Sequence, residues 1–141
     1  MVKRVKINWK GPQVAEVVQT NVAEALGEFG LRVEGHAKRE LQKGHGVLTG
    51  TLRRSIHTAG PDYSWSGDDV EPSPSAPERG GVLAKAVKTA VGLVVQVGSG
   101  LRYALAVHQG HGSFKGYHYL RKGLNKAKKE LPEVLKRHKL K

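Results

Sequence analysis

Residues 91–110 read VGLVVQVGSGLRYALAVHQG, and this stretch does most to decide the fold. Its β-branched first half predicts a strand, which the Gly98-Ser99-Gly100 break ends. Residues 101–109 then predict a short amphipathic helix, and Gly110 gives the backbone freedom needed where that helix stops. Because residues 82–90 are also rich in valine and alanine, we expect them to form a hairpin or meander with the strand, although a helix there fits as well.

A second block, VLTGTLRRSI at residues 47–56, lies between this region and the N-terminus. Thr49-Gly50 predicts a turn that leads into an extended segment with Leu52 and Ile56 on one face. A single helical turn over residues 52–55, capped by Thr49, is equally allowed.

Residues 13–43 predict a long helix, because apolar residues recur there in steps of three and four. Lys43-Gly44-His45-Gly46 gives the helix a clear end. Three glycines within it each weaken the helix by up to about 1 kcal/mol relative to alanine. The predicted apolar stripe consists of Val14, Val18, Val22, Leu26, Phe29, Val33, Ala37 and Leu41.

Residues 121–139 predict a basic C-terminal helix that Pro132 kinks or restarts. Its apolar stripe is Leu120, Leu124, Ala127 and Leu131, and residues 117–120 allow a short final strand. The sum is one α+β domain over residues 1–141, with a long N-terminal helix, a small and mostly antiparallel sheet, a short helix and this basic helix.

Two further segments stand apart from these elements. Residues 60–81 hold four of the six prolines, which predicts a long flexible loop, and Tyr63 and Trp65 in it suggest docking on another surface. Residues 1–10 form a basic arm, and the alternation over residues 3–9 is typical of a short strand.

The formal charge of +12 is concentrated at the two ends of the chain. Residues 1–10 and 115–141 carry all of the excess, whereas acids and bases balance between them. Basic ends favour polyanions, either nucleic acid or acidic partner proteins, although a merely solvated tail has the same composition. The absence of cysteine excludes disulfides, and no stretch is apolar enough to span a bilayer, so we expect a soluble, non-secreted protein without a membrane partner.

Catalytic and metal-binding patterns are weak in this sequence. His108, His111 and His118 are a candidate metal set, but they lie in a glycine-rich region without a nearby carboxylate. Gly98-Ser99-Gly100 lacks the lysine and the spacing of a phosphate loop, and no nucleophile-elbow motif surrounds any serine. We therefore expect no catalytic residues, no cofactor and no metal.

The basic C-terminal helix is the stronger functional signal. Its cations can contact phosphates, or an acidic partner, without reading a base sequence. No aromatic residue interleaves them, so base stacking is not predicted. The candidate residues are Lys126, Lys128, Lys129, Lys136 and Arg137.

The order of the motifs resembles one family, the head–tail joining or tail-completion proteins of long-tailed bacteriophages. A long helix is followed by Thr49-Gly50-x-Leu52-Arg53-x-Ser55-Ile56, by Val97-Gly98-Ser99, by Tyr103-Ala104-x-x-Val107, by Gly110, and by Tyr119-Leu120-x-x-x-Leu124. The similarity covers roughly residues 13–135. Two positions depart from the family pattern: His108 replaces an acidic residue, and His118-Tyr119-Leu120 replaces a proline–phenylalanine–leucine run.

The resemblance implies a small non-catalytic α+β subunit of the virion neck or tail, assembled in the host cytoplasm. Related proteins form rings, commonly hexameric, that bind the head connector and the tail tube and through whose lumen DNA passes. The resemblance further implies that Leu52, Ser55, Ile56, Tyr103, Ala104 and Val107 are core or interface positions, and that Thr49, Gly50 and Gly110 are turn positions. Two rival hypotheses remain: a sequence-nonspecific nucleic-acid-binding protein that uses its basic termini, and a small metal-dependent enzyme that uses the histidines.

Overall fold

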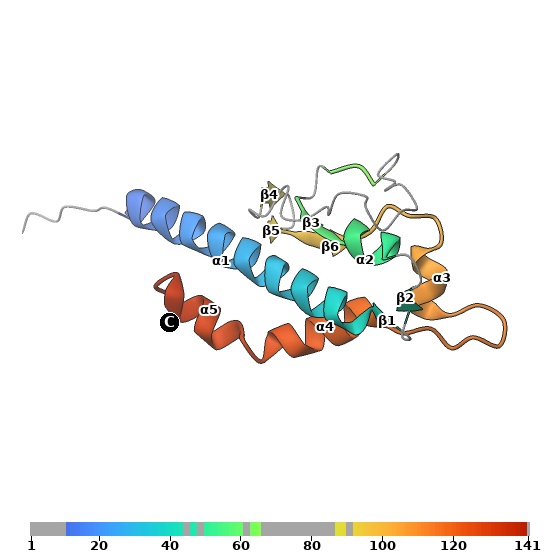
Figure 1. Cartoon of the computed structure of the whole chain (residues 1–141). Coiled ribbons are helices and arrows are strands. Elements are labelled where there is room, and N and C mark those ends of the chain that lie inside the picture. Colours follow the sequence, from blue (N-terminus) through green and yellow to red (C-terminus); the bar gives the residue numbers. More distant parts are fainter. Residues whose placement is uncertain are drawn as a thin grey trace, which may run out of the picture.

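The computed structural model describes residues 11–43, 46–47, 50–60, 63–65, 87–89 and 92–140. The predicted strand over residues 3–9, most of the loop over 60–81, and Thr49 lie outside them. The elements follow in the order α1 (Gly11–Glu40), β1 (Gln42–Lys43), β2 (Gly46–Val47), α2 (Thr51–Ser55), β3 (His57–Ala59), β4 (Val87–Thr89), β5 (Gly92–Val94), β6 (Gln96–Gly98), α3 (Ala104–Gln109), α4 (Tyr119–Lys128) and α5 (Leu131–Arg137) (Figure 1). This is the α+β class that the sequence predicts.

The predicted long helix is confirmed as α1, a helix of 30 residues. Thirty residues at 1.5 Å each make it about 45 Å long. It ends at Glu40 instead of Lys43, because Gln42 and Lys43 pair in parallel with β2. The predicted stripe is buried only toward the C-terminal end: Val33, Ala37 and Leu41 are 6%, 0% and 0% exposed, whereas Val14 and Val18 are 59% and 47% exposed.

Apart from the parallel pair of β1 and β2, the strands form short antiparallel pairs. β4 and β5 pair as the predicted hairpin, with Val87 opposite Val94. β6, which follows at once, pairs instead with β3, with His57 opposite Gly98. Of the two alternatives for the block at 47–56, the helical turn is correct, and the chain becomes extended only after it. The residue at the N-cap of α2 is Gly50, which takes a φ of 80°, instead of the expected Thr49.

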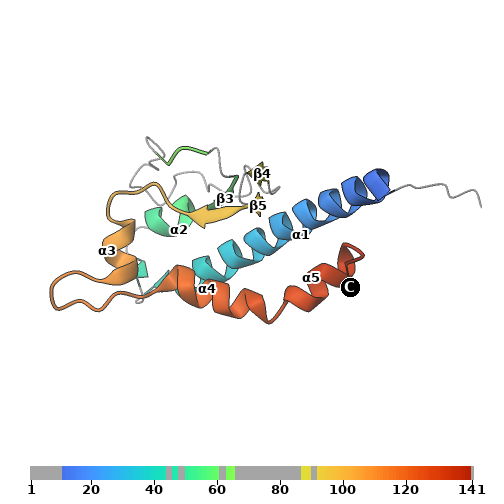
Figure 2. The ribbon, with the colours of Figure 1, turned by 180° about the vertical axis from the view of Figure 1, so that it is seen from behind.

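α1 lies between two layers. Figures 1 and 2, which view the molecule from opposite sides, both show α2, β3, β4 and β5 on one side of α1 and the two C-terminal helices on the other. On the strand side the buried carboxylate of Glu34 accepts hydrogen bonds from Lys38 Nζ at 2.9 Å and from Thr58 Oγ1 at 2.8 Å. This polar link fixes the register of α1 against β3, because each buried charge requires a partner.

The structure contradicts one prediction for the C-terminal region and confirms another. The expected strand over residues 117–120 is wrong, because α4 already begins at Tyr119, directly after His118 turns the chain with a φ of 51°. The predicted restart at Pro132 is confirmed, because the helical region is divided into α4 and α5 and Pro132 lies in the first turn of α5.

The face that α4 buries coincides with the predicted stripe of Leu120, Leu124, Ala127 and Leu131 only at Ala127, which is 0% exposed. The buried residues are Tyr119, Gly123 and Ala127, whereas Leu124 is 36% exposed. A Cβ on Gly123 would lie only 2.8 Å from the backbone nitrogen of Ala37. The two helices therefore approach so closely that only small residues fit between them, and the leucines are displaced to the flank of the contact.

Candidate functional site

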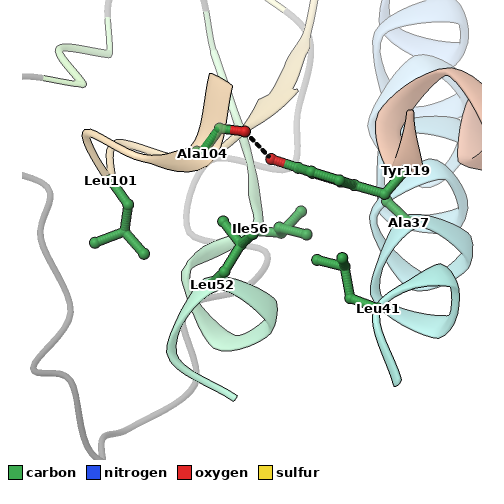
Figure 3. Close-up of a cluster of buried hydrophobic side chains, with 7 residues drawn as sticks. All are labelled: Ala37, Leu41, Leu52, Ile56, Leu101, Ala104 and Tyr119. Atoms are coloured by element: carbon green, nitrogen blue, oxygen red, sulfur yellow. Dashed lines mark hydrogen bonds between the residues drawn. The ribbon is translucent and has the colours of Figure 1, made fainter. Parts of the chain in front are cut away.

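The motif residues converge on one buried cluster. Leu52 and Ile56 come from the first block, Leu101 and Ala104 from the second, and Tyr119 from the start of α4 (Figure 3). The cluster rests on α1 through Ala37 and Leu41. The Tyr119 hydroxyl donates a hydrogen bond to the backbone carbonyl of Ala104 at 3.0 Å, and burial raises the pKa of Tyr119 to about 12. Segments far apart in the sequence are thus joined where α1, α2, α3 and α4 meet.

A chain of hydrogen bonds joins the two serines of the motifs. Ser55 Oγ donates to the carbonyl of Leu52 at 2.7 Å and therefore accepts from Ser99 Oγ, which lies 2.6 Å away. Ser99 Oγ in turn accepts from the backbone N–H of Leu101 at 3.2 Å. Both hydroxyl protons are engaged, and the nearby ring of His57 contacts the carbonyl of Ser55, not its hydroxyl. The geometry holds the two blocks together.

Gly110 is a turn position, as predicted. Its φ is 98°, and a Cβ there would collide with the carbonyl oxygen of Phe114 and lie 2.7 Å from the carbonyl carbon of Lys115. The backbone returns after this turn, so that Tyr117 N–H donates to the carbonyl of Val107 at 2.9 Å. Gly110 therefore allows α3 and the start of α4 to lie side by side.

Three large apolar side chains at α3 and in the segments beside it are exposed. Tyr103 is 47% exposed, Leu105 64% and Phe114 42%. Of the residues predicted as core or interface, Ala104 is buried and Val107 packs partly buried against the cluster, but Tyr103 is not a core residue. Exposed apolar side chains of this size offer contact area to a partner protein.

The three candidate metal ligands do not converge. The rings of His108 and His118 meet edge to face with centroids 5.5 Å apart, whereas His111 lies exposed in the turn. Burial, together with the nearby His118 and Arg121, lowers the pKa of His108, which favours the neutral ring. Among the described residues, no group of three or more histidine or acidic side chains is placed to hold a metal ion.

The basic candidates of α4 and α5 divide into two kinds. Lys126 forms an ion pair with Glu40, and Arg137 pairs with Glu28 at 2.7 Å. Lys128, Lys129 and Lys136 are exposed, and no ion pair to them is found in the part of the chain that the structure describes. Of the five candidate residues, these three lysines are the ones without an acidic partner among the described residues, so their charges are available to another molecule.

Sequence reasoning did not find the charged network that binds α5 to α1. Arg32 lies 3.0 Å from Glu28 and 3.0 Å from Glu130, which also contacts His36 Nε2 at 2.7 Å. The hydrogen bonds from Arg32 and His36 lower the pKa of Glu130. The spacing of Glu28 and Arg32 by four residues was a readable signal for their own pair. No sequence signal connected either residue to Glu130, which is 98 positions from Arg32.

Comparison with known families, with curated proteins and with solved structures gave no match. In the described residues, no helix combines the length and the apolar character that crossing a membrane demands.

Proposed function

We propose that this protein is a structural component of a long-tailed bacteriophage virion. In this proposal it is a tail-completion or head–tail joining subunit that forms a ring at the head-proximal end of the tail. The observation that carries the proposal is the convergence of the separated motif residues, among them Leu52, Ile56, Ala104 and Tyr119, on one buried cluster. Motifs that resemble one family in order and spacing, and that meet in space, support a shared architecture.

The roles of the motif residues favour assembly over chemistry. The hydroxyl groups of Ser55 and Ser99 both donate structural hydrogen bonds, and Gly110 forms a turn. In contrast, Tyr103, Leu105 and Phe114 leave apolar side chains at the surface, where a neighbouring protein can cover them. We therefore propose a non-catalytic subunit whose partners are copies of itself, the head connector and the tail tube. Its place is the neck of the virion, after assembly in the host cytoplasm.

Deleting the gene from a phage that carries it tests this proposal. We expect lysates that contain full heads and separate tails without infectious particles, because the two parts cannot join. Adding the purified protein should restore joining in vitro, and electron micrographs should show it at the upper end of the tail. Infectious particles with a normal neck in the deletion strain would contradict the proposal.

A second candidate function is sequence-nonspecific binding of nucleic acid. It is favoured by Lys128, Lys129 and Lys136, which are exposed and lack carboxylate partners among the described residues. A protein that works in this way should bind random duplex DNA tightly at moderate salt. Its association constant should fall steeply with salt, by a slope of about 0.9 for each phosphate contacted. Weak binding with a shallow slope favours the structural role, in which DNA merely passes through the lumen.

A further inference from the structure

The outer side of α4 carries four cations around one asparagine. Neighbours on a helix surface lie three and four residues apart, so the positions that surround Asn125 are 121, 122, 128 and 129. All four are basic: Arg121, Lys122, Lys128 and Lys129. Lys129 lies at the C-cap of α4, but its φ of −68° and ψ of −24° keep it on the helical path. We call these five residues the cation face.

The cation face points away from α1. The residues that α4 buries are Tyr119, Gly123 and Ala127, and Gly123 lies against the backbone of α1. Because each residue turns the helix by about 100°, Asn125 lies about 200° from Gly123, which is the opposite side. All five residues of the cation face are exposed, as this geometry requires. Figures 1 and 2 both show α4 and α5 as the outer layer on this side of α1.

No carboxylate balances the cation face in the part of the chain that the structure describes. The sequence contains no aspartate or glutamate between residues 79 and 129. Of the described glutamates around α4, Glu130 and Glu133 pair with Arg32 on α1, and Glu40 pairs with Lys126. None of the four cations of the face forms an ion pair with a described residue. Their charges are therefore available to another molecule.

The cations do not help α4 to form. Arg121 and Lys122 lie in its first turn, where the positive end of the helix dipole repels them, and that turn contains no acidic residue. Lys122 and Lys126 lie four residues apart, so two like charges are neighbours on the helix surface. Both features weaken an isolated helix. Helix stability does not explain the cation face, whereas the binding of an anionic partner does.

The composition of the cation face fits a nucleic acid better than an acidic protein. Lysine is depleted in protein–protein interfaces, whose buried centres are apolar, and the cation face contains no apolar residue. Protein–DNA interfaces are much more positive, and lysine, arginine and asparagine are usual donors to phosphate and sugar oxygens. Residues 120–141 contain no phenylalanine, tyrosine or tryptophan on which an unpaired base could stack. A duplex, with one phosphate charge for about every 1.7 Å of its axis, matches these properties.

We propose that the cation face binds the phosphate backbone of a nucleic-acid duplex without reading its sequence. Arg121 and Lys128 are seven residues apart, or about 10 Å along the helix, and so are Lys122 and Lys129. The face is thus large enough to contact several phosphates at once, and the amide of Asn125 between them offers a further donor. The inference deepens the second candidate function, on which it rests, because it names the surface that meets the nucleic acid.

Two double substitutions remove charge from the cation face. R121Q/K128Q and K122Q/K129Q each replace two cations by uncharged side chains of similar length. All four positions are exposed, so both proteins should keep the fold. Circular dichroism and thermal melting will check this.

Two further variants serve as controls. R39Q/R53Q also removes two positive charges from exposed positions, but on α1 and α2, and neither arginine has an ion pair among the described residues. K122R/K129R keeps both charges of the cation face. It should bind like wild type, and a loss of binding in it would contradict a contact that depends on charge alone.

The measurement is the fluorescence anisotropy of a labelled DNA duplex of random sequence, about 20 base pairs long, between about 50 and 200 mM salt. Each variant of the face should lose at least about tenfold in association constant. Its salt slope should become shallower by about 0.9 for each phosphate contact removed. R39Q/R53Q should change the affinity less than about threefold, because charges more than about 10 Å away are largely screened at 0.1 M salt.

Two competitors separate a duplex from other polyanions. These are oligothymidine of the same length and polyglutamate of the same total charge. Unlabelled duplex should compete better than either. Stronger competition by oligothymidine would show that the protein prefers single strands, and stronger competition by polyglutamate would show that it prefers acidic protein. Either result would overturn the proposal.

The remaining outcomes separate the cation face from the functions proposed above. Wild type that does not bind the duplex at about 50 mM salt would refute both the cation face and the second candidate function. If wild type binds with a steep salt slope and both variants of the face bind equally well, only the cation face is refuted, since other cations of the chain then carry the binding. The deletion strain tests the virion role independently of these results.

Discussion

Gly123 sets the distance between α4 and α1. A Cβ at this position would lie 2.8 Å from Ala37 N, 2.9 Å from Val33 O and 3.1 Å from Ala37 Cα, all backbone atoms that cannot rotate away. We expect Gly123→Ala to lower the free energy of unfolding by about 1–3 kcal/mol through overpacking. This loss should outweigh the gain of up to about 1 kcal/mol in helix propensity. Urea denaturation measures the difference.

Gly35→Ala is the matched control for this substitution. Gly35 also lies within a helix, but a Cβ there would meet nothing within 4 Å. We expect this variant to gain about 1 kcal/mol, since only the helix propensity changes. A Gly123→Ala protein as stable as Gly35→Ala would show that α4 can move away from α1 without cost.

Tyr119 links a buried hydrogen bond to the pH dependence of stability. Its ring is 1% exposed, and burial raises its pKa from an ordinary value of 10.0 to about 12. The folded state thus holds the proton more tightly than the unfolded state. The stabilisation is complete below pH 10 and is lost as the pH rises through 12.

Tyr119→Phe tests this coupling. At neutral pH it should lower the free energy of unfolding by about 1–2 kcal/mol, because the Ala104 carbonyl loses its donor. Between pH 10 and 12 the variant should lose stability less steeply than wild type. Urea midpoints across this range measure both effects, and identical slopes above pH 10 would contradict the assignment.

At the scale of elements, local sequence patterns were sufficient for α1, whereas for the β4–β5 hairpin they left a helix as an alternative. The steps of three and four that end in Val33, Ala37 and Leu41 depend only on helix geometry, and these residues are buried. The start of α4 was not predictable in this way. Tyr119 follows a left-handed His118, and its place in the core depends on Ala104, which is 15 positions away.

The candidate site shows the same limit. The sequence singled out the two motif blocks that contain Ser55 and Ser99. It did not predict that these two serines, 44 positions apart, share a hydrogen bond. From the sequence we expected Lys126 and Arg137 to be available to a partner. In the structure they form ion pairs with Glu40 and Glu28 on α1. Which lysines remain available to a partner is decided by packing between distant helices.

Glu130 controls how firmly α5 is held on α1. Its hydrogen bonds with Arg32 and then with His36 lower its pKa below the ordinary 4.5. Its contribution to stability is therefore present above pH 4.5 and is lost as the pH falls through the lowered pKa. We expect Glu130→Gln to speed amide hydrogen exchange in α5 at neutral pH, and the difference from wild type to disappear in strong acid.

Glu133→Gln is the control for Glu130→Gln. The side chain of Glu133 is 62% exposed and meets Arg32 only at 3.4 Å, so its loss should change exchange in α5 less at neutral pH. If both variants exchange equally fast, the hydrogen bonds to Glu130 are not what holds α5.

At the scale of the whole molecule, burial along α1 rises from one end to the other. Val14 and Val17 are each 59% exposed, whereas Ala37 and Leu41 are both 0% exposed. Stability against local opening follows the density of buried contacts, so the two ends of this one helix should differ in their opening free energies. The exposed side chains of Val14, Val17 and Val18 therefore lie on the least stable part of the longest element.

This gradient predicts how α1 opens locally. In dilute wild type, amides of residues 14–22 should exchange through local fraying, while those of 33–40 exchange only on global unfolding. Hydrogen exchange read by mass spectrometry resolves the two segments. If residues 14–22 are already as protected as 33–40 in the dilute protein, the first turns of α1 are stable without a partner, and the burial gradient does not govern local opening.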